Sequence, residues 1–259
     1  MTSFLYVALA VMIFTIVAIF TTTLRDKRRA QQLAEAAPKF GFSFAVDGTN
    51  LLAEGLADLP LFLISQLPRQ SEIRNVLRKP LTEGDLILCD YHYWTGGNSK
   101  TRFDHDQTVA CFRLSRPTFP EFTLRQRPSN REREMLRMGL GFASLPSRMG
   151  SSSFRHALDR MVGSLEDEGI QWSAHPNFNQ RYWLKAPEHA DETRALFSGE
   201  LIEFLEPRTS PLCIESAGRW LAIYRKDTKV KPDDIGTFSG EAERVLQILL
   251  KAHEGAGKT

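Results

Sequence analysis

The stretch DLILCDYHYW, residues 85–94, has the strongest strand signal in the chain. It contains β-branched and aromatic residues and no glycine or proline. A loop containing Gly96, Gly97 and Asn98 follows, and FDHDQTVACFRL, residues 103–114, then indicates a returning strand. We therefore predict a long antiparallel hairpin. Apolar residues occupy both alternating faces of its inner half, so we expect both strands to be covered on two sides, as central strands are.

Shorter strand and helix patterns surround this hairpin. Strand patterns occupy residues 40–46, 74–78, 122–126, 170–173, 182–185, 212–216 and 219–225. Helical patterns occupy residues 50–59, 154–165, 191–197, 200–206 and the region after Lys231. Strands in antiparallel hairpins, with helices between and after them, predict an α+β fold instead of alternating βαβ units.

The domain organisation follows from composition. Residues 38–253 are expected to form the soluble α+β domain, either as one unit or as two halves, 38–127 and 154–253. The segment 128–153 mixes Gly, Ser and Pro with apolar residues, which predicts a mobile connection between the halves. Residues 254–259, EGAGKT, are expected to be a disordered tail.

The stretch SFLYVALAVMIFTIVAIFTTTL, residues 3–24, contains no charged residue. A helix of this length, at about 1.5 Å per residue, crosses a hydrocarbon core of roughly 30 Å. The alternative is a cleaved signal peptide, which would carry a basic n-region, a shorter apolar run and a small-residue cleavage site. We therefore predict a single-pass transmembrane anchor at residues 1–24. No Lys or Arg precedes Arg25, so the positive-inside rule predicts a cell-membrane protein with its C-terminal domain in the cytoplasm.

Residues 25–37, RDKRRAQQLAEAA, are rich in helix formers. Pro38 disfavours helix at the residue before it. We expect the anchor helix to continue as a polar juxtamembrane stalk that ends near Ala36. The basic residues at its start set the topology, and contact with anionic lipid head groups is the alternative role.

Composition excludes several functions. The net charge of +2 over 259 residues gives no strong basic field, so no nucleic-acid partner is predicted. Cys89, Cys111 and Cys213 are widely spaced and form no C-x-x-C motif, which fits free thiols in a reducing compartment. Neither G-x-G-x-x-G nor a Walker sequence occurs, so we predict no bound cofactor.

The polar residues with possible chemistry gather at the open end of the hairpin: Asp90, His92, Asp104, His105 and Asp106. If the loop is centred between residues 98 and 99, His92 lies opposite His105, close enough to share a divalent ion such as zinc. A shift of one residue would place the two histidines on opposite faces. Metal sites need three or four convergent ligands, so the preferred interpretation is a solvated hairpin end without a metal. No residue is assigned a catalytic role.

Several short motifs follow one another along the chain: FGFSF, GLADLPLF, RNVL, DYHYWTGGNSK, HDQTVACF, AHPNFNQRYWL, ALF and WLAIYRKDTKVKP. Their order resembles a family of small bacterial membrane-anchored proteins known chiefly as uncharacterised proteins. The resemblance covers most of the soluble part of the chain. At residues 130–165 this sequence departs from the pattern of the family. It implies a bacterial source and a coherent domain type, and it assigns no role to any residue.

Two classes of function follow from the sequence. The first is a membrane-tethered, non-catalytic module that binds a protein or lipid partner at the cytoplasmic face. The second is a small membrane-bound enzyme or metal-binding protein that uses the His and Asp residues of the 85–114 hairpin. The sequence offers no nucleophile–base pair and no metal-ligand motif, which favours the first class.

Overall fold

The computed structural model describes residues 23–66, 71–95, 103–116, 118–127, 169–186 and 188–256, together with Tyr6, Met12 and Phe20. Most of the predicted anchor, the connection at 128–153 and the predicted helix at 154–165 lie outside the described residues. Among those that are described, no helix is both long and apolar enough to cross a membrane.

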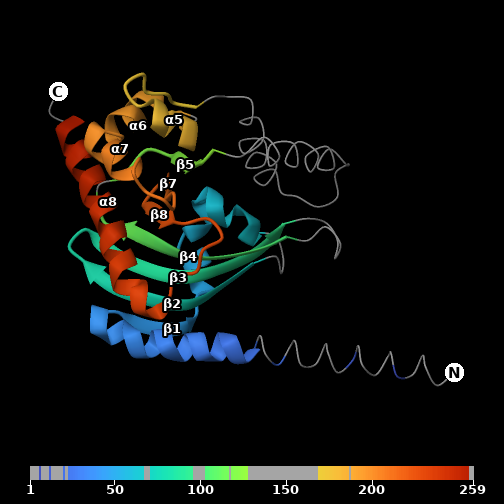
Figure 1. Cartoon of the computed structure of the whole chain (residues 1–259). Coiled ribbons are helices and arrows are strands. Elements are labelled where there is room, and N and C mark those ends of the chain that lie inside the picture. Colours follow the sequence, from blue (N-terminus) through green and yellow to red (C-terminus); the bar gives the residue numbers. More distant parts are fainter. Residues whose placement is uncertain are drawn as a thin grey trace.

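Within the described part of the chain, eight strands form one antiparallel sheet in the order β1-β2-β3-β4-β8-β7-β5-β6 (Figure 1). The strands are β1 (Ser43–Asp47), β2 (Ser71–Leu81), β3 (Gly84–Thr95), β4 (Phe103–Leu114), β5 (Phe122–Gln126), β6 (Tyr182–Lys185), β7 (Cys213–Ala217) and β8 (Trp220–Tyr224). The predicted α+β class and the predicted central hairpin are confirmed.

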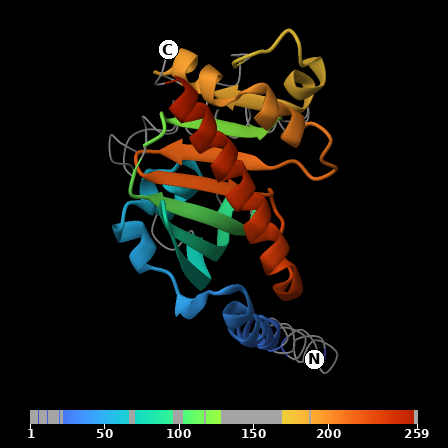
Figure 2. The ribbon, with the colours of Figure 1, turned by 90° about the vertical axis from the view of Figure 1, so that its left-hand side faces the viewer.

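Helices cover the sheet on two sides. Their bounds are 23–36 for the first helix, then η1 (Ala37–Phe40), α2 (Asn50–Ala53), η2 (Leu56–Asp58), η3 (Pro60–Gln66), α5 (Pro176–Arg181), α6 (Ala190–Leu196), α7 (Gly199–Leu205), η5 (Pro232–Asp234) and α8 (Ile235–Ala256). The long α8 runs diagonally across the strands (Figure 2). It continues to Ala256, so residues 254–256, which were expected to belong to a disordered tail, are helical. The helix thus extends beyond Leu250, the last residue of its buried apolar stripe.

Two apolar clusters occupy the two faces of the sheet. On one face, Leu86, Leu88 and Phe112 pack with α8, α6, α7 and the first helix. On the other face, Ile87 and Cys111 pack with α2, η2 and η3. All these side chains are fully buried, so the central strands are covered on both sides as predicted.

The strand order joins regions that are distant in the sequence. β4 pairs with β8, with Val109 opposite Tyr224, and β5 lies between β7 and β6. The strands of residues 38–127 and of residues 169–253 therefore belong to one continuous sheet. Among the described residues, each of the two apolar clusters contains side chains from both halves, so neither half has a separate sheet or core there.

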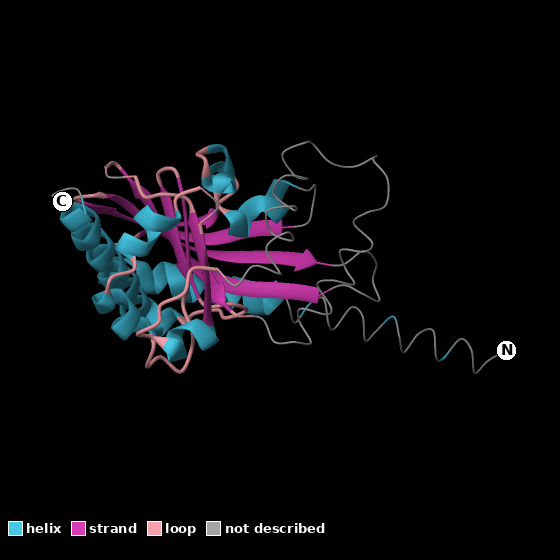
Figure 3. Cartoon of the chain, turned by 90° about the horizontal axis from the view of Figure 1, so that it is seen from above, coloured by secondary structure: helices cyan, strands magenta, loops and turns pink. Residues whose placement is uncertain are grey.

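The segment expected to be a polar stalk packs against the domain. Residues 23–36 form the predicted helix, but Leu33 and Ala37 are buried within the first apolar cluster. Figure 3 shows, from above, that the long strands extend past the helices that cover them on one side of the molecule. The folded body therefore begins before Pro38. The expected stalk is corrected to a docked helix, because its apolar side chains recur at helical spacing on the side that meets the sheet.

Candidate functional site

The two hairpin histidines do not face each other. His92 lies opposite Asp106, and His105 lies opposite Tyr93. The expected pairing of His92 with His105 is wrong by one residue, because Thr95 pairs with Phe103 and sets the register of the whole hairpin. Successive residues of a strand point to opposite faces, so the histidines lie on opposite faces of the sheet.

His92 belongs to a chain of charged partners. Its Nδ1 lies 3.2 Å from Oδ1 of Asp106, and Nζ of Lys229 lies 2.7 Å from the same oxygen. The hydrogen bond to Asp106 raises the pKa of His92, although burial acts in the opposite direction. The same bond lowers the pKa of Asp106 well below its ordinary range, against the effect of burial, and Lys229 lowers it further. Asp104 is more distant, with 3.8 Å between its Oδ1 and Nε2 of His92.

His105 has its own partners on the other face. Its Nδ1 lies 2.7 Å from Oδ1 of Asp227, and its ring stacks on Tyr93 with 4.6 Å between centroids. Burial raises the pKa of Tyr93 above its ordinary value. Within the described ranges, no three His, Cys, Asp or Glu side chains are placed to hold a metal ion together. The geometry therefore gives two separate His–Asp pairs in place of one convergent site.

The fifth polar residue of the hairpin, Asp90, is the centre of a buried cluster. Nε and Nη2 of Arg29 donate to its two carboxylate oxygens at 2.6 and 2.7 Å. Such a bidentate pair is the strongest form of carboxylate recognition by arginine. The side chain of Asp90 is 6% exposed and that of Arg29 is 17% exposed. The first helix is therefore fixed to β3 by a largely dehydrated ion pair.

Two more side chains complete the shell of Asp90. Asn75 donates to it at 2.9 Å, and the Thr108 hydroxyl donates at 2.9 Å. Asn75 has a φ of 53° at a register shift in β2, a conformation that asparagine tolerates better than most residues. The Thr108 hydroxyl also accepts from the backbone N–H of Val230 at 3.0 Å. The cluster thus joins the first helix, three strands and the segment before η5.

Sequence reasoning placed Asp90 at the hairpin end but did not find Arg29. The sequence contains one signal that could have found it. Leu33 and Ala37 follow Arg29 at spacings of four residues, so the three share one side of a helix. An arginine on the apolar side of a helix needs a carboxylate partner, because an unpaired buried charge is costly.

A second buried carboxylate lies on the opposite face of the sheet. Glu215 is fully buried and accepts from Nε of Arg125 at 2.8 Å, the Tyr224 hydroxyl at 2.6 Å and the backbone N–H of Leu61 at 2.7 Å. Burial raises the pKa of Tyr224, and the charge of Glu215 raises it further. These donors occupy both oxygens of Glu215, so its clear role is to hold η3 against the sheet.

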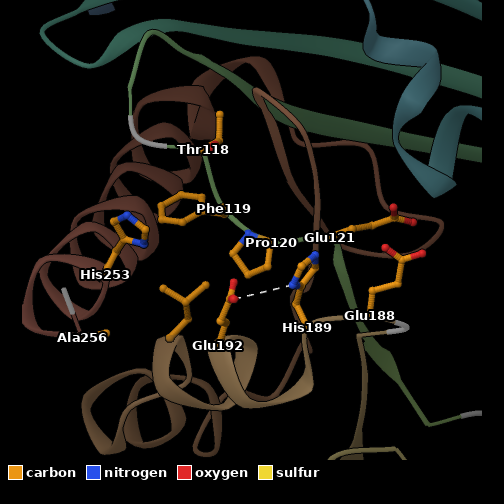
Figure 4. A pocket seen from close by; sticks show the side chains of 10 residues that line it. Thr118, Phe119, Pro120, Glu121, Glu188, His189, Glu192, His253 and Ala256 are labelled. Carbon is orange, nitrogen blue, oxygen red and sulfur yellow. Dashed lines mark ion pairs between the residues drawn. The ribbon is translucent and has the colours of Figure 1, made fainter. Parts of the chain in front are cut away.

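A surface hollow of about 520 Å³ lies between residues 118–121, the start of α6 and the end of α8 (Figure 4). Three glutamates and two histidines line it: Glu121, Glu188, Glu192, His189 and His253. Nδ1 of His189 lies 3.6 Å from Oε1 of Glu192. The side chains in Figure 4 stand around an open hollow and do not converge on one point. Acidic residues around an open hollow do not by themselves make a binding site.

Comparisons with known proteins add one distant structural similarity. No family model matches the chain, and no curated protein matches it. A solved structure described as the crystal structure of the mycobacterial trehalose monomycolate transport factor A, TtfA, aligns with a TM-score of 0.46 and 12% sequence identity. The alignment covers 86% of this chain and 94% of that chain. A similarity at this level carries no argument about function.

Proposed function

We propose that the protein is a single-pass membrane protein whose α+β domain faces the cytoplasm and acts as a non-catalytic interaction module. The observation that carries the proposal is the docked first helix. The described helix, 23–36, begins within the last two residues of the uncharged stretch 3–24, and Arg29 and Leu33 fix it to the sheet. An anchor in this position would hold the domain close to the membrane without a flexible linker.

Exposed apolar residues support the membrane part of the proposal. Tyr6, Met12 and Phe20 are helical, with 69%, 52% and 64% of their surface exposed. Large apolar side chains at this exposure gain free energy when lipid or a partner covers them. The uncharged stretch that contains them is long enough for a membrane-spanning helix.

The paired state of the polar groups supports the non-catalytic part. His92 and His105 each have a carboxylate partner, and Asp90 and Glu215 are surrounded by donors. A general base or a nucleophile must reach a substrate atom, and these groups are engaged with their own neighbours. The resemblance to bacterial membrane-anchored proteins agrees with this proposal and adds no activity to it.

Membrane preparations from a bacterial expression host test the proposal. We expect the full chain to stay in the membrane fraction after a carbonate wash, and a C-terminal fusion to a cytoplasm-dependent reporter to be active. Recovery in the soluble fraction would refute the anchor, and activity of a periplasm-dependent reporter would refute the orientation. A bound divalent metal that is lost on His92→Ala would instead favour the enzyme or metal-binding alternative.

A further inference from the structure

The docked helix sets the distance between the sheet and the proposed membrane. Residues 92–95 and 103–106 form the open end of the β3–β4 hairpin, here called the distal end. In Figure 1 the distal end lies on the side of the molecule where the described part of the first helix begins, and it extends past the first described turn of that helix. Asp26 also pairs with Arg74 at 3.2 Å, so the start of the helix is held over β2 near this end.

The first helix and β3 meet at the ion pair between Arg29 and Asp90, so the distance that each extends beyond this point can be compared. An α-helix rises about 14 Å between positions 20 and 29, at roughly 1.5 Å per residue. The strand β3 advances about 17 Å between Asp90 and Thr95, at roughly 3.3 Å per residue. Phe20 is the last residue of the uncharged apolar run before the threonines. The distal end therefore reaches the level at which the apolar run ends.

The side chains near this level suit a lipid surface. Arg25, Lys27 and Arg28 are exposed on the first helix, and Lys226 is exposed in the turn after β8. That turn lies beside the distal end, since its Asp227 pairs with His105. Trp94 lies on β3 within the distal end, 5.9 Å from the His92 ring. Tryptophan and basic residues are enriched where a protein meets the head groups.

We propose that the distal end, together with Arg25, Lys27, Arg28 and Lys226, forms a surface that rests on the anionic head groups of the membrane. This inference rests on the proposed anchor and deepens it by naming the part of the domain that touches lipid.

Exposed carboxylates also lie near this level, but they have cationic partners: Asp26 pairs with Arg74, Asp106 with Lys229, and Asp227 with His105, while Asp104 lies 3.8 Å from His92. The exposed cations Arg25, Lys27 and Arg28 come in addition to these pairs, so the surface is complementary to anionic lipid. The exposed cations of the helix face the level at which anionic head groups would lie, and the anchor would keep the two in contact.

Fluorescence quenching by head-group-labelled lipid tests the surface in the full-length protein. Cys89, Cys111 and Cys213 are buried free thiols, so a thiol dye would react selectively at an introduced cysteine. Trp94→Cys places the dye at the distal end, and Asp104→Cys, opposite it on β4, provides a second probe if the first variant fails to fold. Lys251→Cys, on the exposed side of the C-terminal part of α8, is the matched control. Each labelled protein is reconstituted into vesicles of phosphatidylcholine and phosphatidylglycerol containing a nitroxide head-group quencher.

We expect several-fold stronger quenching at positions 94 and 104 than at 251, and weaker quenching at both in vesicles of phosphatidylcholine alone. Protein that floats with the vesicles but shows equal quenching at 94, 104 and 251 would overturn this inference and leave the anchor intact. Protein that does not float with the vesicles would overturn the anchor and this inference together. Equal quenching of position 94 in the two lipid mixtures would refute the anionic character of the partner.

Discussion

Replacing Arg29 by methionine tests the ion pair on which the position of the first helix depends. The substitution keeps the apolar part of the side chain and removes both donors to Asp90. The carboxylate then remains in a site where only 6% of its side chain is exposed, with Asn75 and Thr108 as its remaining side-chain donors. Breaking a buried ion pair on one side costs about 3–5 kcal/mol. The partial exposure of Arg29 favours the lower limit, so we expect a loss of about 3 kcal/mol.

Urea denaturation of the full chain in detergent, followed by circular dichroism, measures this loss. Arg28→Met is the matched control, since Arg28 is exposed, and it should change the free energy of unfolding by at most about 0.5 kcal/mol. Combining Arg29→Met with Asp90→Asn removes the uncompensated charge and should restore about 1–2 kcal/mol. If Arg29→Met is no more damaging than Arg28→Met, the pair contributes nothing and the docked helix needs another explanation.

Three further predictions concern the core, the hairpin end and the N-terminal boundary. Ile87→Ala should cost about 2–5 kcal/mol by leaving a cavity, whereas Val46→Ala, at a position that is 63% exposed, should cost at most about 0.5 kcal/mol in the same melts. In the folded protein the pKa of His92 is raised above its ordinary value of 6.5. The stability that its pairing with Asp106 contributes is therefore fully present below pH 6.5 and is lost as pH rises through the folded-state pKa. The stability difference between the protein and His92→Gln should therefore be larger at about pH 6 than at about pH 9, and a difference that grows with pH would contradict the pairing. A chain that begins at Pro38 lacks Arg29 and Leu33 and should melt at a lower temperature in calorimetry than one that begins at Thr23; equal melting temperatures would show that the helix adds no stability.

Sequence patterns predict a strand or helix correctly where residues close together in the sequence determine it. The strand at 103–114 has the predicted bounds because its inner half is apolar and a proline-rich connection follows it. The helix α5 (Pro176–Arg181) is absent from the helical patterns predicted above, although it starts at a proline. Proline is favoured in the first turn of a helix, so Pro176 is a local signal for this helix.

The candidate site could be predicted only in part. It depends on the exact register of β3 and β4 and on contacts between residues that are far apart in the sequence. The pairing of His92 with Asp106 instead of His105 differs from the expectation by one position, which composition cannot resolve. Arg29 and Asp90 are far apart in the sequence, and a basic residue after an apolar stretch already has a sufficient explanation in membrane topology. The sequence therefore identified the residues of the hairpin end but not the partner that matters most to Asp90.

The pairing of β4 with β8 has a consequence for synthesis on the ribosome. Val109 cannot meet Tyr224 until nearly the whole chain has been made. Until then β4 presents an apolar strand edge with unpaired backbone groups, which is a site for wrong pairing or aggregation. An N-terminus already inserted in a membrane would keep nascent chains apart during this interval. Release of the N-terminus should then lower the yield of folded protein more than it lowers the stability of the finished fold.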